Sequence, residues 1–316
     1  MENFIFSLNT TLPVFLVIVL GWFLMQKKMF NDNFVDIINK YVFKVSLPVL
    51  LFKDIATTPI RDVFDPKFVV FCMIGTTIMF MGIWALTSIF MKDKTMVGAF
   101  TQAAARGSAA VLGIAFVQNI YGDSGMTPLM IVSAVPLYNI YSVIILTVCA
   151  NDQVHTNAAA TIKRAFLNIL KNPIILGIAA GVPFSLLNIE LPPIVLKTVS
   201  SVAQTATPMA LLAVGAGFEG RKAIKKIKPT LIATFIKLVA LPALFFPFAI
   251  AMGFRESALV AILVMVGSPT TVTCYIMAKN MGNDEVLSSS IVVTATLLSS
   301  ITLTFWIFLL KSMALI

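Results

Sequence analysis

The chain has 316 residues, of which 59% are hydrophobic and only 12% are charged. Its mean hydropathy of +0.95 excludes a soluble globular domain and indicates a protein with several membrane-spanning helices. The net charge of +9 does not indicate a nucleic-acid partner, because the basic residues lie in short loops between apolar runs, where membrane proteins carry them. We therefore expect the lipid bilayer, and no nucleic acid, to surround the chain.

Ten apolar runs are long enough to cross a bilayer, which predicts an all-α integral membrane protein. They cover residues 4–25, 34–52, 68–91, 95–120, 126–150, 173–188, 192–217, 229–253, 256–279 and 286–310. The first run lacks a preceding basic region, so we expect a retained span. A polar linker at 151–172 separates a first five-helix repeat at 1–150 from a second at 173–316, and Thr161–Leu170 within it has the pattern of an interfacial helix.

Lysine and arginine gather in the odd-numbered loops, including the linker. By the positive-inside rule, this predicts a multi-pass protein of the cell membrane with both termini outside and the linker in the cytoplasm.

An internal repeat emerges when the sequence is shifted by 160 residues. The matched pairs are Pro13 with Pro173, Gly21 with Gly181, Pro48 with Pro208, Gly107 with Gly267, and Gly122 with Gly282. Glycine and proline fix backbone geometry, so the matches indicate a structural repeat. Because each half holds an odd number of spans, the second half must enter the membrane from the opposite side. This predicts an inverted repeat, as in many secondary transporters.

The ninth apolar run contains Gly267-Ser268-Pro269, which resembles the start of a helix. Serine is a good N-cap and proline suits the first helical position, so we expect two half-helices here. Irregular backbone at membrane depth is tolerated only inside protein or beside a watery cavity, so a break favours a binding site. A simple proline kink is the alternative.

The same shift places Gly107 and Ser108 of the fourth run on Gly267 and Ser268, although the fourth run has no proline. If both runs break, two half-helix N-termini converge near the midplane. Their free N–H groups and positive dipole ends favour an anion.

Two cations lie within apolar runs, Arg106 beside the fourth-run break and Lys237 in the eighth run. Each is costly in lipid and should face protein, water or a ligand. They either contact substrate or only neutralise helix C-terminal ends. All acidic residues lie in loops or near segment ends, which argues against a cation/proton antiporter and favours an anionic substrate. A guanidinium suits a carboxylate because it can bind it bidentately.

The candidate substrate-binding residues flank the two breaks: Arg106, Gly107, Ser108, Ser268, Pro269, Thr270, Thr271 and Thr273. Secondary candidates are Gln102, Asn139, Gln204, Thr207, Lys237 and Tyr275. Hydroxyls away from the breaks more often bond to their own helix. The three cysteines have no metal-ligand spacing, and no cofactor is expected. For uptake, a sodium ion near the breaks or a proton is the expected coupling ion, whereas efflux or substrate exchange needs neither.

With these residues in hand, the chain resembles bacterial members of the auxin efflux carrier family, which include malate-type permeases. The resemblance rests on Arg106-Gly107 with Leu112-Gly113, on Lys237 with Leu241-Pro242, and on Ser268-Pro269-Thr270-Thr271 with the segment from Ala278 to Asp284. It implies a fold of the bile acid symporter and sodium–proton antiporter type, with crossed broken helices four and nine. It also implies a mobile core of segments three to five and eight to ten, a more static panel of segments one, two, six and seven, a homodimer, and elevator-type alternating access. Ser108 departs from the family pattern, which has proline or asparagine at this point.

The leading hypothesis is a secondary active transporter of small organic anions, such as the dicarboxylate malate. The alternatives are a sodium-coupled symporter of a larger organic acid and a non-transporting receptor or sensor for a small carboxylate. An enzyme is disfavoured, because the single histidine, His155, lies in the polar linker.

Overall fold

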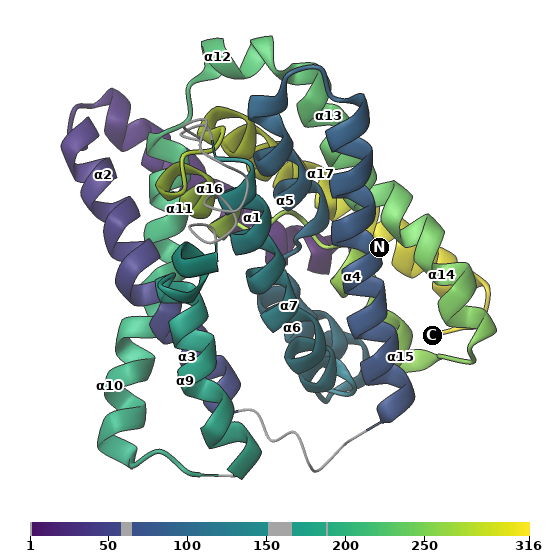
Figure 1. Cartoon of the computed structure of the whole chain (residues 1–316). Helices are drawn as coiled ribbons and strands as arrows, with labels where there is room; N and C mark the ends of the chain where they lie inside the picture. The colour runs from purple at the N-terminus through teal and green to yellow at the C-terminus, as the bar shows by residue number, and fades with distance from the viewer. Residues whose placement is uncertain (1, 58–64, 151–165, 188) are drawn as a thin grey trace.

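The structure is a computed structural model that describes residues 2–57, 65–150, 166–187 and 189–316 (Figure 1). Within these ranges every named element is a helix. Five helical stretches are long and apolar enough to cross a membrane, namely α4 (Pro66–Phe90), α7 (Thr127–Val148), Pro193–Ala216, Ile227–Ala251 and α17 (Glu285–Ser312). Shorter apolar helices accompany them. Residues 161–165 of the predicted interfacial helix at Thr161–Leu170 lie outside the described residues, and residues 166–170 are helical.

The remaining elements have these bounds: α1 Glu2–Gln26, α2 Asp32–Tyr41, the π-turn η1 Val42–Ser46, α3 Leu47–Ala56, the 3-10 turn η2 Lys94–Met96, α5 Val97–Ala105, α6 Ala109–Tyr121, α9 Pro173–Leu187, α10 Pro193–Gln204, α11 Ala206–Ala216, α12 Gly220–Lys225, α13 Ile227–Phe235, the π-turn η3 Ile236–Ala240, α14 Leu241–Ala251, α15 Glu256–Gly267 and α16 Thr273–Asn280.

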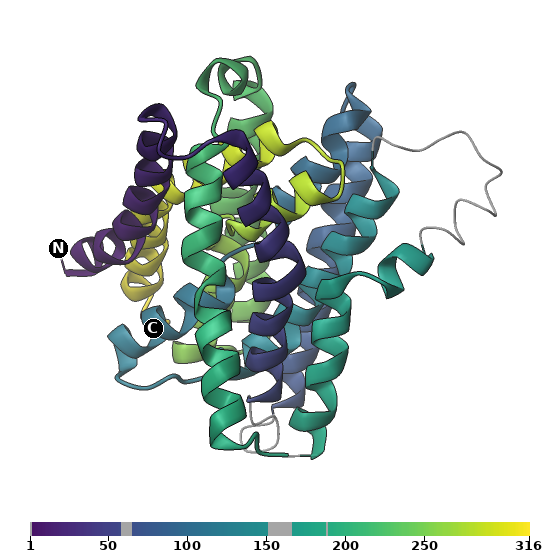
Figure 2. The same ribbon diagram turned by 90° about the vertical axis from the view of Figure 1, so that its left-hand side faces the viewer.

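One group of helices, α1 to α3 with α9 to α11, packs through close backbone contacts, and we call it the panel. A Cβ atom added at Gly21 of α1 would lie 2.3 Å from the carbonyl oxygen of Leu212, and one added at Gly215 of α11 would lie 1.9 Å from that of Ile18. Only glycine permits this approach. In the same way α3 packs along α9 and α10, and Figure 2 shows the dark purple α3 between its two green to teal neighbours.

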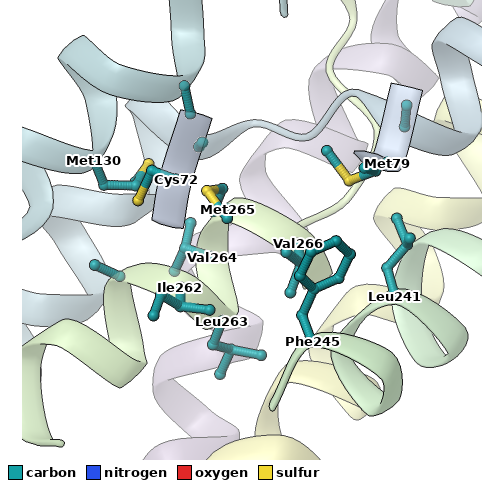
Figure 3. Close-up of a cluster of buried hydrophobic side chains, with 14 of the residues drawn as sticks. Cys72, Met79, Met130, Leu241, Phe245, Ile262, Leu263, Val264, Met265 and Val266 are labelled. Atoms are coloured by element: carbon teal, nitrogen blue, oxygen red, sulfur yellow. The ribbon is translucent and has the colours of Figure 1, made fainter. Parts of the chain in front are cut away.

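The other helices, α4 to α7 and α12 to α17, form what we call the core bundle. Its centre is α15, in which every residue from Leu259 to Gly267 is buried. A helix that is apolar on all sides is stable either in lipid or inside protein, and α15 is enclosed by protein. Figure 3 shows the residues of α15 among Cys72 and Met79 of α4, Met130 of α7, and Leu241 and Phe245 of α14. The panel meets this bundle where α1 packs against α17, which lie side by side in Figure 2.

The short π-helix η3 interrupts the span from α13 to α14, and Lys237 lies within this π-helix. Pro242, the second residue of α14, has no N–H to donate to the carbonyl of Leu238, four residues earlier. That freed carbonyl accepts a hydrogen bond of 2.9 Å from the indole nitrogen of Trp306 on α17. The sequence therefore makes a local irregularity here, and the tertiary structure satisfies it.

The ninth apolar run is interrupted, but its second half-helix begins later than predicted. The sequence prediction used Ser268 as its N-cap and Pro269 as its first residue, and this detail is wrong. Ser268 instead ends α15, because its N–H bonds to Val264 and its ψ of 155° is extended, as a residue before proline prefers. The next helix, α16, starts at Thr273.

Candidate functional site

The two helix breaks lie directly against each other. Gly107, between α5 and α6, forms an isolated antiparallel bridge with Thr270, between α15 and α16. The N–H of Ser108 donates to the carbonyl of Pro269 at 2.9 Å, and the hydroxyl of Thr270 donates to the carbonyl of Ala103 at 2.7 Å. Backbone groups released by one break are thus satisfied by the other, as a buried irregular backbone requires.

Gly107 allows this close approach. A Cβ atom added at this position would lie 2.3 Å from the hydroxyl oxygen of Ser268 and 3.0 Å from the ammonium nitrogen of Lys237. Ser268 is fully buried, and its hydroxyl has no hydrogen-bond partner among the described residues. Any side chain at residue 107 would push the two breaks apart.

The C-terminal ends of α5 and α15 converge on Lys237. Its buried ammonium group donates to the carbonyl of Ala105 at 3.0 Å and to that of Met265 at 3.3 Å. The carbonyl of Met265 also accepts the hydroxyl of Tyr138 at 2.8 Å. A cation at two negative helix ends is electrostatically favourable, and it satisfies carbonyls that lack an intrahelical partner. In this conformation Lys237 therefore caps the half-helices.

The N-terminal ends of α6 and α16 face a small cavity of about 50 Å³ between the panel and the core bundle. Its polar lining consists mainly of hydroxyl groups, and no lining residue is acidic. The lining residues are Thr11, Val14, Ser108, Leu112, Thr207, Leu211, Pro269, Thr270, Thr271, Val272 and Thr296. Neither Ser108, at the start of α6, nor Val272, at the start of α16, caps its helix with a side-chain hydrogen bond. The field at this end of both helices is positive.

Arg106 points elsewhere and does not line this cavity. Its side chain is 4% exposed, and its guanidinium donates to the amide oxygen of Asn139 at 2.8 Å and to the sulfur of Met277 at 2.8 Å. The amide nitrogen of Gln102 contacts the same sulfur at 3.3 Å. Among the described residues no carboxylate pairs with this guanidinium, so its charge rests on neutral groups.

The remaining candidates are spread around the breaks. Thr273 begins α16, and its hydroxyl donates to that of Thr271 at 3.3 Å. Tyr275, two residues after Thr273, is buried and packs against Gly217, which follows α11 of the panel. Gln204 is exposed at the end of α10 and does not join the cavity. The structure thus brings together Ser108, Thr207 and the residues from Pro269 to Thr271.

Two cavity hydroxyls were missed by the sequence analysis, Thr11 on α1 and Thr296 on α17. Each lies within a long apolar span, where a lone threonine usually bonds to its own helix, as Thr296 also does through the carbonyl of Val292 at 2.7 Å. No local signal marks them, because the cavity arises only where α1, α6, α11, α17 and the break before α16 meet.

Comparison with known proteins places the chain in a family. The family model described as "Membrane transport protein" matches residues 6–307. The chain belongs to this family. It is therefore a multi-pass integral membrane transporter of the auxin efflux carrier type, and not an enzyme.

Two relatives illustrate the range of the family. A putative malonate transporter of Rhizobium meliloti is 25% identical over 309 residues, which cover 96% of both chains. The uncharacterized transporter YfdV of Escherichia coli K12 is 23% identical over 241 residues, which cover 75% of this chain and 76% of that protein. The similarity to the first extends over nearly the whole membrane domain.

Proposed function

We propose that this transporter is a secondary active carrier of small dicarboxylates, of the malonate and malate class. The observation that carries the proposal is the cavity at the N-terminal ends of α6 and α16, whose polar groups are hydroxyls and whose lining holds no acidic residue. Two converging positive helix ends with no opposing carboxylate favour an anion over a cation or a neutral solute. The putative malonate transporter among its relatives supports a substrate with carboxylate groups.

In this proposal a carboxylate of the substrate occupies the space between the two half-helix ends. The hydroxyls of Ser108 and Thr271 and nearby backbone N–H groups donate to it, while Thr207 contacts it from the panel. Arg106 strengthens the positive field from behind the break, and it becomes a direct ligand only if its side chain turns away from Asn139. Ser268 does not line the cavity, and its fully buried hydroxyl reaches a substrate only if the break rearranges.

The size of the cavity supports alternating access. Its volume of about 50 Å³ holds a few water molecules and is too small for a dicarboxylate. One wall comes from α1 and α11 of the panel, and the other from α6, α17 and the break before α16. Substrate entry therefore requires the core bundle to move against the panel, which is the elevator-type motion that we propose.

Paired contacts support an inverted repeat in this architecture. Gly21 lies against the backbone of Leu212, and Gly181 lies against that of Phe52. A shift of 160 residues converts one pair into the other, since it relates residue 21 to 181 and residue 52 to 212. We propose the repeats 1–150 and 173–316, with both termini outside and the linker in the cytoplasm, and a homodimer joined through the panel.

Uptake of a dianion needs a driving ion. Each negative charge that enters against an inside-negative potential of 100 mV costs about 2.3 kcal/mol, so we propose coupling to sodium or protons. The hydroxyl and carbonyl oxygens at the breaks are suitable for sodium. Uptake driven separately by a sodium gradient and by a pH gradient distinguishes the two ions.

The test is uptake of labelled malonate, malate and a monocarboxylate of similar length by proteoliposomes. We expect uptake of the dicarboxylates and a loss of about tenfold or more in Ser108→Ala and in Thr271→Val, since each removes a donor to a charged group. Thr198→Val, on the exposed face of α10, is the matched control. Uptake that is independent of both hydroxyls would reject the proposed site, and counterflow of an amine instead of an acid would reject the substrate class.

A further inference from the structure

A second concave region lies on the opposite side of the core bundle from the panel, between α4 and α14 (Figure 1). It is an open groove of about 410 Å³, lined only by apolar side chains: Val70, Phe71, Ile74, Gly75, Ile78, Leu244, Phe245, Phe248 and Met252. Its volume falls in the range of small-molecule sites. Nothing in the proposed transport mechanism uses it.

The groove follows two matching stripes of side chains. On α4 the stripe runs through Val70, Ile74 and Ile78, each of which is about half exposed. Because these residues are four apart, they share one face of the helix over a length of about 12 Å. Leu244 and Phe248 on α14 form the facing stripe and are 53% and 61% exposed.

The floor of the groove is closed by aromatic packing. Phe71 and Phe245 meet edge to face with their ring centroids 6.5 Å apart. Gly75 leaves room beside them, since a Cβ atom added there would lie 3.1 Å from the Phe245 ring. The two helices thus contact each other at the floor of the groove and stay apart at its mouth. This leaves an elongated apolar groove on the outer surface of the core bundle.

Two cations mark one end of this groove. Lys67 lies one helical turn before Val70, and its ammonium group donates to the carbonyl of Met252 at the end of the groove and lies 5.5 Å from the Phe254 ring centroid. Arg255 follows Met252 after a short turn, and its guanidinium bonds to the carbonyls of Ile250 at 3.0 Å and Phe254 at 2.6 Å. Both side chains are exposed, and neither has an ion-pair partner among the described residues.

Two of the described carboxylates lie near these cations in the sequence, and neither forms an ion pair with them. Asp65 accepts the N–H groups of Lys67 and Phe68 and so caps α4. Glu256 begins α15 and lies near Tyr121 of α6, away from the groove. Each cation gives part of its donors to carbonyls at the end of α14, and its remaining donors are exposed and can bind an anion at the membrane surface, where long basic side chains extend toward the headgroups.

We propose that the groove between α4 and α14 binds one anionic phospholipid, with an acyl chain along the apolar stripes and its phosphate against Lys67 and Arg255. The charge at one end and the uninterrupted apolar lining match the two parts of such a lipid. This inference is independent of the transported substrate.

The test is native mass spectrometry of the purified transporter with dioleoyl phosphatidylglycerol and with dioleoyl phosphatidylcholine, which have the same acyl chains. We expect one phosphatidylglycerol to be retained in preference. Lys67→Gln with Arg255→Gln should weaken its binding by about 5- to 30-fold, as expected for contacts of one or two cations with an anionic lipid. Lys53→Gln with Lys197→Gln, which removes two charges from the panel, is the matched control and should leave binding unchanged.

A groove-filling variant, Ile74→Trp, should reduce retention of this lipid further, because the side chain occupies the apolar groove. If the arginine variant does not fold, Lys67→Gln alone carries the test, since Lys67 is exposed at the start of α4. Equal retention of both lipids, or full retention in the groove variants, overturns the proposal. A change from dimer to monomer in Ile74→Trp without a change in bound lipid also overturns it, because the groove would then be a contact between two copies.

Discussion

At the scale of single residues, Lys237 and the candidate cavity lie at different kinds of half-helix end. Lys237 lies at the C-terminal ends of α5 and α15, where carbonyl groups are exposed, and the cavity lies at the N-terminal ends of α6 and α16. The ammonium group of Lys237 is therefore bound by carbonyl groups of the protein itself. The positive field in the cavity comes instead from backbone N–H groups, so the site can attract an anion without a cation in its lining.

This assignment predicts a loss of stability on substitution of Lys237 by methionine, which has a similar shape but no donor. The carbonyls of Ala105 and Met265 would lose hydrogen bonds to a charged group, which contribute about 1.5–3 kcal/mol each. Relief from burying the charge offsets part of this loss, so we expect a decrease of about 2 kcal/mol in the free energy of unfolding.

Thermal unfolding in detergent measures this effect. The control is Lys228→Met at the exposed start of α13, which should unfold at the wild-type temperature. A wild-type unfolding temperature for Lys237→Met would show that the ammonium group does not hold the half-helices together.

At the scale of elements, the panel and the core bundle are also joined by polar contacts at the ends of α2 and α16. The ammonium group of Lys279 lies 3.1 Å from a carboxylate oxygen of Asp36 and 3.4 Å from one of Glu285. Beside it, the side-chain amide of Asn280 donates to the carbonyl of Asn39 at 3.3 Å. Motion of α16 relative to α2 must break these contacts.

We therefore predict that Asp36→Asn accelerates transport, because it weakens a restraint between the panel and the core bundle, the two parts that move in the proposed mechanism. The Asp36 side chain is 53% exposed, so the pair contributes at most about 1 kcal/mol, which limits the increase in uptake rate to about fivefold. Glu219→Gln is the control, since it removes an ion pair with Lys222 at the start of α12 that does not connect the panel to the core bundle. Unchanged or slower uptake in Asp36→Asn would mean that this pair does not restrain the motion.

The helix bounds also show which parts of the structure could be predicted from the sequence. The break at Ser268 and Pro269 was predictable, because proline removes a backbone donor from a helix and holds the preceding residue extended. The exact start of α16 at Thr273 was not, because it depends on the hydrogen bond from Ser108 to Pro269 across the two breaks. The direction of Arg106 depends likewise on Asn139 and Met277, two partners far along the chain.

At the scale of the whole molecule, two helical bodies meet along the candidate site. Close backbone contacts through Gly21 and Gly215 make the panel rigid, and the fully buried α15 holds the core bundle together. Between the two bodies, Thr11 and Thr207 of the panel line the same cavity as the helix breaks. The proposed alternating access requires this interface to separate at lower cost than either body unfolds.

The central claim is that a dicarboxylate binds where the two helix breaks meet. Equilibrium binding of labelled malonate to the purified transporter, compared between wild type and the Ser108→Ala/Thr271→Val double variant, tests it most directly. We predict saturable binding that other dicarboxylates displace, and an affinity at least tenfold lower in the double variant at unchanged thermal stability. Equal affinity in both proteins, or displacement by amines and not by carboxylates, would contradict the account.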